Sequence, residues 1–234
     1  MFRRLLTIAL VAGLASGLLV TALQMSQVWP LILAAETFEG AEPTQAHHHG
    51  AGSADAATHA AHIEAWAPED GAERMAYTLL FNLVAGFGFA LLINAGLALA
   101  RASGRDVDPL SGLLWGLAGF VAFALAPALG LPPELPGMPA ADLLARQIWW
   151  LATVLASLAG IALIVLPRRA FLALLGVGLL VLPHVVGAPH ADPAEISKVP
   201  PALAAHFVAA SLVSAAVFWA TLGTLSGWLQ RRYG

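Results

Sequence analysis

The chain has 234 residues, of which 59% are hydrophobic and 11% charged, with a net charge of −3 and a mean hydropathy of +0.78. A soluble domain carries about 25% charged residues, so this composition excludes a soluble globular protein and predicts one membrane domain over residues 1–234. The chain has no cysteine, which excludes disulfides, iron–sulfur clusters and thiolate zinc sites. Its eleven basic residues come in pairs rather than patches, so nucleic acid is not expected as a partner.

Six apolar runs follow one another along the chain. They cover residues 5–23, 76–100, 110–129, 148–166, 170–186 and 202–229. Because a helix needs about 20 apolar residues to cross a bilayer, the sequence predicts an all-α, polytopic bundle of about six transmembrane helices. Five is the alternative count. The first run could be a cleaved signal peptide, although an anchor is favoured. The fifth has only thirteen uninterrupted apolar residues before Pro183, so it could be re-entrant.

The basic residues favour one orientation of these six runs. With the N-terminus inside, the inner ends carry Arg3, Arg4, Arg101, Arg105, Arg168, Arg169, Arg231 and Arg232, and the outer ends carry Arg74, Arg146 and Lys198. This distribution obeys the positive-inside rule. If the fifth run did not cross, the ratio of inner to outer basic residues would fall from 8:3 to 6:5. We therefore expect a multi-pass protein of the inner (cytoplasmic) membrane with both termini cytoplasmic.

Small and amide residues inside the runs predict how the helices pack. The small residues recur at four-residue spacing as Ala9, Gly13 and Gly17, Gly112 and Gly116, and Gly223 and Gly227. Such spacing lets two helices approach closely. Asn82 and Asn94 lie within the second run, where interhelical hydrogen bonds are favoured and coordination of a passing ion is the alternative.

Residues 36–74 form one long loop between the first two runs, on the extracytoplasmic side, with eight acids and five histidines. The histidines are His47, His48, His49, His59 and His62. Much of this loop is expected to be disordered without a ligand. Imidazole and carboxylate together suit divalent Zn, Co, Ni, Cu or Fe, so the loop is predicted to bind metal. The alternative is that the histidines are weak, unselective binders or polar filler.

Three more histidines lie near the outer ends of the fifth and sixth runs. His184, His190 and His206 are predicted to form a metal-uptake site there, since ionisable residues in spans are candidates for function. For each histidine alone, a hydrogen bond between helices is the alternative. Glu134, in the proline-rich loop 128–137, is a further candidate metal ligand at the outer mouth, and Arg146 is a candidate ion-pair partner for an acid of that loop.

Common catalytic motifs are absent from the sequence. It has no P-loop, no His-Glu-x-x-His and no Gly-x-Ser-x-Gly, so ATP hydrolysis, zinc-protease and lipase chemistry are not expected. We predict a protein that is not an enzyme and holds no permanently bound cofactor. One alternative is a membrane metalloenzyme with His184, His190 and His206 as ligands and an open fourth position. The other is a scaffold subunit that presents metal without transporting it.

Seven segments of the chain resemble the CbtA family of probable cobalt transporter subunits. They are residues 1–6, 28–33, 66–74, 112–120, 126–137, 146–150 and 183–189, and the most diagnostic is Ala-Pro-Ala-Leu-Gly-Leu-Pro-Pro-Glu-Leu-Pro-Gly at 126–137. The resemblance implies uptake of Co²⁺ for cobalamin biosynthesis and a CbtB-like small membrane subunit, with one span, as partner. The family is usually described with about five spans. It supplies no ligand residues, so the predicted sites rest on the residues above.

Together these patterns predict that the outer loop gathers ions and that the outer ends of the last two runs pass them into the bundle. Selectivity cannot come from affinity alone, because Co²⁺ binds such ligands less tightly than Ni²⁺ or Cu²⁺. Binding should weaken below a pH of about 6.5, where protons compete for imidazole.

Overall fold

In the computed structural model, residues 2–39, 71–166 and 169–234 are described, and every regular element in these ranges is a helix. The elements are α1 (Phe2–Leu23), η1 (Gln24–Val28), α2 (Trp29–Glu39), α3 (Ala72–Ala102), α4 (Pro109–Phe120), η2 (Val121–Leu125), α5 (Ala126–Ala128), α6 (Leu143–Val165), α7 (Ala170–Val186) and α8 (Pro201–Tyr233). The predicted all-α class is confirmed. The loop histidines His47, His48, His49, His59 and His62, with the disorder predicted around them, lie outside the described residues.

Five of the helical rods are long and apolar enough to cross a membrane. Two of them contain a π-helical turn: α1, η1 and α2 form the rod Phe2–Glu39, and α4, η2 and α5 form the rod Pro109–Ala128. The first rod therefore continues well past the predicted apolar run, which ends at Leu23. The sixth helix, α7, has 17 residues, and at 1.5 Å per residue its length is about 25 Å, against a hydrocarbon core of about 30 Å.

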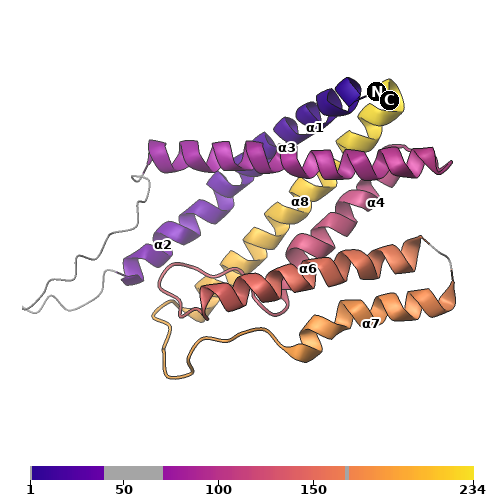
Figure 1. The fold of residues 1–234 in the computed structure, drawn as a ribbon. Helices are drawn as coiled ribbons and strands as arrows, with labels where there is room; N and C mark the ends of the chain where they lie inside the picture. The colour runs from indigo at the N-terminus through magenta and orange to yellow at the C-terminus, as the bar shows by residue number, and fades with distance from the viewer. Residues whose placement is uncertain (1, 40–70, 167–168) are drawn as a thin grey trace, which may run out of the picture.

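Successive rods run back and forth through one bundle (Figure 1). The beginning of α1 and the end of α8 consequently lie together, which is the arrangement that an even number of passes produces. The shorter α7 packs along α6 in the opposite direction. The bundle therefore contains five helices that are long and apolar enough to span a membrane, which is the alternative count, and α7 as a shorter sixth apolar helix.

Glycines set the closest approaches between paired helices. A Cβ atom added to Gly13 of α1 would lie 2.7 Å from the carbonyl oxygen of Gly86 in α3, and one added to Gly160 of α6 would lie 2.7 Å from that of Gly176 in α7. The α4–α8 pair is closer still, because a Cβ on Gly112 would overlap the carbonyl oxygen of Gly223. The predicted close packing through small residues is therefore confirmed.

Aromatic side chains fill the middle of the bundle where α3, η2 and α8 meet. The ring of Trp219 lies 4.7 Å from that of Phe89 and stacks at 5.4 Å on that of Phe123, measured between centroids. Phe218 packs edge-on against Trp219 at 5.6 Å. These contacts fix η2 against α8.

Asp108 begins α4 with a capping box. Its Oδ1 accepts a hydrogen bond from the Ser111 backbone N–H at 2.7 Å, while Ser111 Oγ accepts one from the Asp108 N–H at 2.8 Å. The bonds from Ser111 stabilise the carboxylate, so they hold the pKa of Asp108 below its ordinary value. A lowered pKa stabilises the fold above the unfolded-state pKa, and that stability is lost as pH falls through the folded-state value.

We expect Asp108→Asn, whose amide oxygen can still cap but does not titrate, to be less stable than wild type at pH 6. The difference should shrink as pH falls below about 4, the ordinary pKa of an Asp carboxyl, until Asp108 of the folded wild type is also protonated. Thermal melting of the purified protein in detergent, followed by circular dichroism from pH 6 to 3, measures both curves. A difference between the two proteins that stays constant over this range would contradict the prediction.

Candidate functional site

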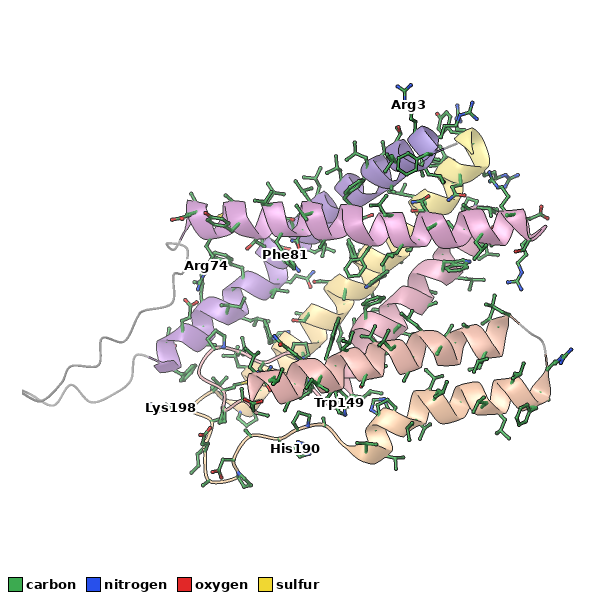
Figure 2. The ribbon with its side chains drawn as sticks, viewed as in Figure 1. Arg3, Arg74, Phe81, Trp149, His190 and Lys198 are labelled. Atoms are coloured by element: carbon green, nitrogen blue, oxygen red, sulfur yellow. The ribbon has the colours of Figure 1, made fainter. Side chains whose placement is uncertain are left out.

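The predicted metal ligands among the described residues lie towards one end of the bundle. We call it the distal end; it is the end where α2 and α7 finish and α8 begins, opposite the end that holds the beginning of α1 and the finish of α8. Figure 2 shows Arg74, His190 and Lys198 towards the distal end and Arg3 at the other. Sequence reasoning assigned the first three residues to the outer side and Arg3 to the inner side.

His184 is held at the junction of α6 and α7. Its half-buried ring packs edge-on against Trp149, with 6.0 Å between centroids, and Trp149 Nε1 donates a hydrogen bond to the Pro183 carbonyl oxygen at 3.3 Å. Trp149 is only 8% exposed. Gly130 and α7 cover the indole, so Trp149 positions the histidine.

His190 and His206 are exposed, unlike His184. His190 is exposed in the segment between α7 and α8, and His206 is exposed in the second turn of α8. In the described part of the chain, no group of three or more His, Cys, Asp or Glu side chains is placed to hold a metal ion. The three histidines thus form no shared ligand set there, and metal binding by each of them stays a prediction.

Glu134 pairs with Arg146 across the proline-rich loop. Arg146 Nη2 lies 2.7 Å from Glu134 Oε2, which confirms the expected ion pair between Arg146 and an acid of this loop. The pair lines a groove of about 630 Å³ between the loop, η2, α6 and α8, with Phe123, Trp150 and Ser211 along its walls. A cation at Glu134 would have to share the carboxylate with Arg146, so coordination by Glu134 also stays a prediction.

A second ion pair joins the two helices that flank the long loop. Arg74 Nη1 donates to Glu36 Oε1 at 2.7 Å, and the Arg74 guanidinium lies 5.7 Å from the ring centroid of Trp29. Residues 36–39 and 72–74, which were assigned to the loop, are helical. The Glu36–Arg74 pair therefore fixes both ends of the intervening segment at the distal end.

Polar side chains inside the bundle form hydrogen bonds with one another. Asn82 Nδ2 donates to Thr21 Oγ1 at 3.0 Å and to Gln24 Oε1 at 2.7 Å, which ties α3 to α1 and η1. The interhelical hydrogen bond expected of Asn82 is confirmed. Its partner Gln24 begins a π-helical turn, a feature that is frequent at functional sites and has no simple sequence signal.

Asn94 belongs to a buried network nearer the other end. Its Nδ2 donates to Ser226 Oγ at 3.1 Å, and its Oδ1 accepts from Gln230 Nε2 at 2.9 Å. Arg101 donates in turn to the Gln230 carbonyl oxygen at 2.8 Å. Sequence reasoning predicted hydrogen bonding by Asn94 but missed Gln230, a residue next to Arg231 that resembles a surface position.

Long apolar helices, close glycine contacts and the interhelical hydrogen bonds of Asn82 and Asn94 define a polytopic α-helical membrane protein. The sequence model of one family, described as "Probable cobalt transporter subunit (CbtA)", matches residues 2–231. The chain therefore belongs to the CbtA family. No curated protein and no solved structure matches it.

Proposed function

We propose that this chain is the membrane subunit through which a transporter takes up Co²⁺ across the inner membrane. The observation that carries the proposal is the family match over residues 2–231, on a chain that folds as a membrane-type helical bundle. The proposed topology has six passes and both termini cytoplasmic. It is supported by the adjacent ends of α1 and α8 and by the excess of arginines predicted at inner ends.

The acidic, histidine-rich segment between α2 and α3 is proposed to gather cations outside. It contains His47, His48, His49, His59 and His62, and the Glu36–Arg74 pair fixes its two ends beside the distal face. Carboxylates attract hydrated cations over a distance of about 10 Å at ordinary ionic strength, and neutral imidazoles then bind them. This segment raises the local ion concentration, so it acts on apparent affinity more than on maximal rate.

His184, His190, His206 and Glu134 are proposed as successive contacts for an ion that enters at the distal end. A conducting path needs binding that is favourable enough to admit the ion and weak enough to release it. Dispersed single ligands meet this requirement better than a closed ligand set. A catalytic metal centre usually has three protein ligands on one ion, and His184, His190 and His206 are not grouped in this way within the part of the chain that is described.

The proposed partner is a CbtB-like small subunit with one span, and the imported cobalt would serve cobalamin biosynthesis. The family describes this chain as a transporter subunit, so further components are part of the assembly. Since raw affinity favours Ni²⁺ and Cu²⁺ over Co²⁺, the partner, the coordination geometry or the metal supply must set selectivity.

Cobalt accumulation by cells that produce this chain with the small partner tests the proposal. Deletion of residues 47–62 is expected to raise the cobalt concentration for half-maximal uptake but to leave the maximal rate unchanged. The double variant His184→Ala/His206→Ala is expected to lower the maximal rate by about tenfold, equivalent to about 1.4 kcal/mol.

Lys198→Ala, an exposed change at the same end, is the matched control and should transport normally. Normal uptake by both the deletion and the histidine variant would refute the assignment of transport to histidines. One tightly held metal ion after purification, without accumulation in cells, would instead favour the metalloenzyme alternative.

A further inference from the structure

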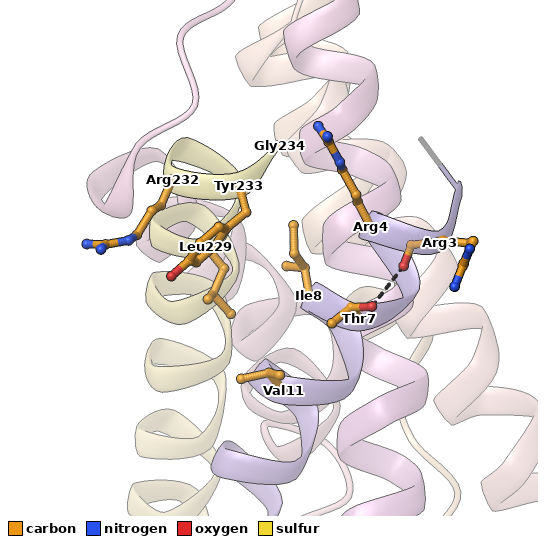
Figure 3. Close-up of a pocket in the computed structure, with 9 residues that line it drawn as sticks. All are labelled: Arg3, Arg4, Thr7, Ile8, Val11, Leu229, Arg232, Tyr233 and Gly234. Carbon is orange, nitrogen blue, oxygen red and sulfur yellow. Dashed lines mark hydrogen bonds between the residues drawn. The ribbon is translucent and has the colours of Figure 1, made fainter.

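A groove opens at the inner end of the bundle as proposed above, between the beginning of α1 and the finish of α8 (Figure 3). It has a volume of about 650 Å³. Its lining consists of Arg3, Arg4, Thr7, Ile8, Val11, Leu229, Arg232, Tyr233 and Gly234. None of these residues belongs to the proposed transport path.

The groove is basic at its mouth and apolar further along the helices. In Figure 3, Arg4 extends upwards at the mouth, while Arg3 and Arg232 extend outwards on opposite sides of it, and all three are exposed. Ile8 and Leu229 form a buried apolar wall, and Val11 continues it one turn deeper, where it is 49% exposed. Between Arg4 and Val11 the helix rises about 10 Å, so the charges and the apolar surface follow one another along the helix axis.

Over the described residues, no Asp or Glu side chain forms a salt bridge with Arg3, Arg4 or Arg232. Arg232 instead lies over the rings of Trp228 and Tyr233, at 5.9 and 5.6 Å from their centroids. The Thr7 hydroxyl donates to the Arg3 carbonyl oxygen at 3.0 Å, so this donor is already used within α1.

We propose that this groove binds an anionic phospholipid of the inner leaflet. Guanidinium groups bind phosphate through paired hydrogen bonds, and basic pockets between transmembrane helices hold acidic headgroups. The apolar wall supplies the surface that an acyl chain needs, and Trp228 and Tyr233 are the residue types that lie at headgroup depth. A free phosphate ion would use only the mouth, so the apolar wall favours a lipid.

The full-length protein, purified in detergent, is titrated with phosphatidylglycerol and with phosphatidylcholine while binding is followed by native mass spectrometry. We expect phosphatidylglycerol to bind more tightly, and Arg4→Gln/Arg232→Gln to weaken that binding by about tenfold. The matched control is Arg105→Gln/Arg169→Gln, which removes two exposed arginines assigned to the same side but outside the groove. The control should change the affinity by less than about twofold.

Equal losses of phosphatidylglycerol affinity in the two double variants would overturn the proposal, because they would show a general effect of charge. Displacement of the lipid by inorganic phosphate at equal concentration would also overturn it and indicate a free-anion site. If the double groove variant does not fold, the single variants Arg4→Gln and Arg105→Gln provide the same comparison. Equal affinity of these two single variants for phosphatidylglycerol would refute lipid binding in the groove.

Discussion

Gly223→Val is expected to lower the free energy of unfolding by about 3 kcal/mol or more, the upper part of the range for overpacked cores. A Cβ at Gly223 would overlap the Gly112 carbonyl oxygen and lie 2.8 Å from the Gly116 Cα. These are backbone atoms, so no side chain can rotate away, and α4 and α8 must separate. Separation removes the contacts of Trp219 with Gly116 and Gly119 along the same interface.

Gly88→Val is the matched control for this change. Gly88 lies in α3, another apolar helix, and a Cβ added there meets no atom within 4 Å. Both variants replace a helical glycine with valine, so the change in intrinsic helix propensity is the same in the two. Unfolding by sodium dodecyl sulfate titration from mild detergent, followed by circular dichroism, measures both. Equal destabilisation of the two variants would contradict the proposed α4–α8 contact.

Asn94→Leu is expected to lower the free energy of unfolding by about 1–3 kcal/mol, the usual penalty for a buried polar group that loses its partner. The substitution removes the donor to Ser226 and one acceptor of the Gln230 amide, which is 1% exposed. Water is excluded there, so one Gln230 N–H has no replacement acceptor. The same unfolding titration measures the loss.

Ser226→Ala is the control within the same network. It removes one neutral hydrogen bond, and such bonds between membrane helices contribute about 0.6 kcal/mol on average. We therefore expect a clearly smaller loss than for Asn94→Leu. A loss at Ser226 equal to that at Asn94 would mean that the hydroxyl contact, and not the Gln230 amide, dominates this network.

Hydrophobic runs predicted the helices well because burial in lipid requires a long apolar stretch. Residues 170–186 coincide with α7, although Pro183 interrupts the run. The first run was placed too short because Gln24, Ser26 and Gln27 lower its hydropathy. In the fold these residues continue a helix through η1, where Gln24 is satisfied by Asn82 and Ser26 by the Leu23 carbonyl oxygen.

Contacts between distant segments were harder to predict. The spacing of glycines indicated close packing, but only the fold shows that Gly223 meets α4 while Gly13 meets α3. Burial of Trp149 depends on Gly130 and α7, so it has no local sequence signal. Likewise, position near a helix end did not reveal that His206 is exposed.

The central proposal is that cobalt crosses the membrane from the distal end of this bundle. The most direct test is uptake of radioactive cobalt into proteoliposomes that contain the chain with its small partner, oriented with the distal end outward. The proposal predicts accumulation above that of empty liposomes, reduced about tenfold by His184→Ala/His206→Ala. Failure of correctly folded protein to move cobalt, with or without the partner, would contradict it.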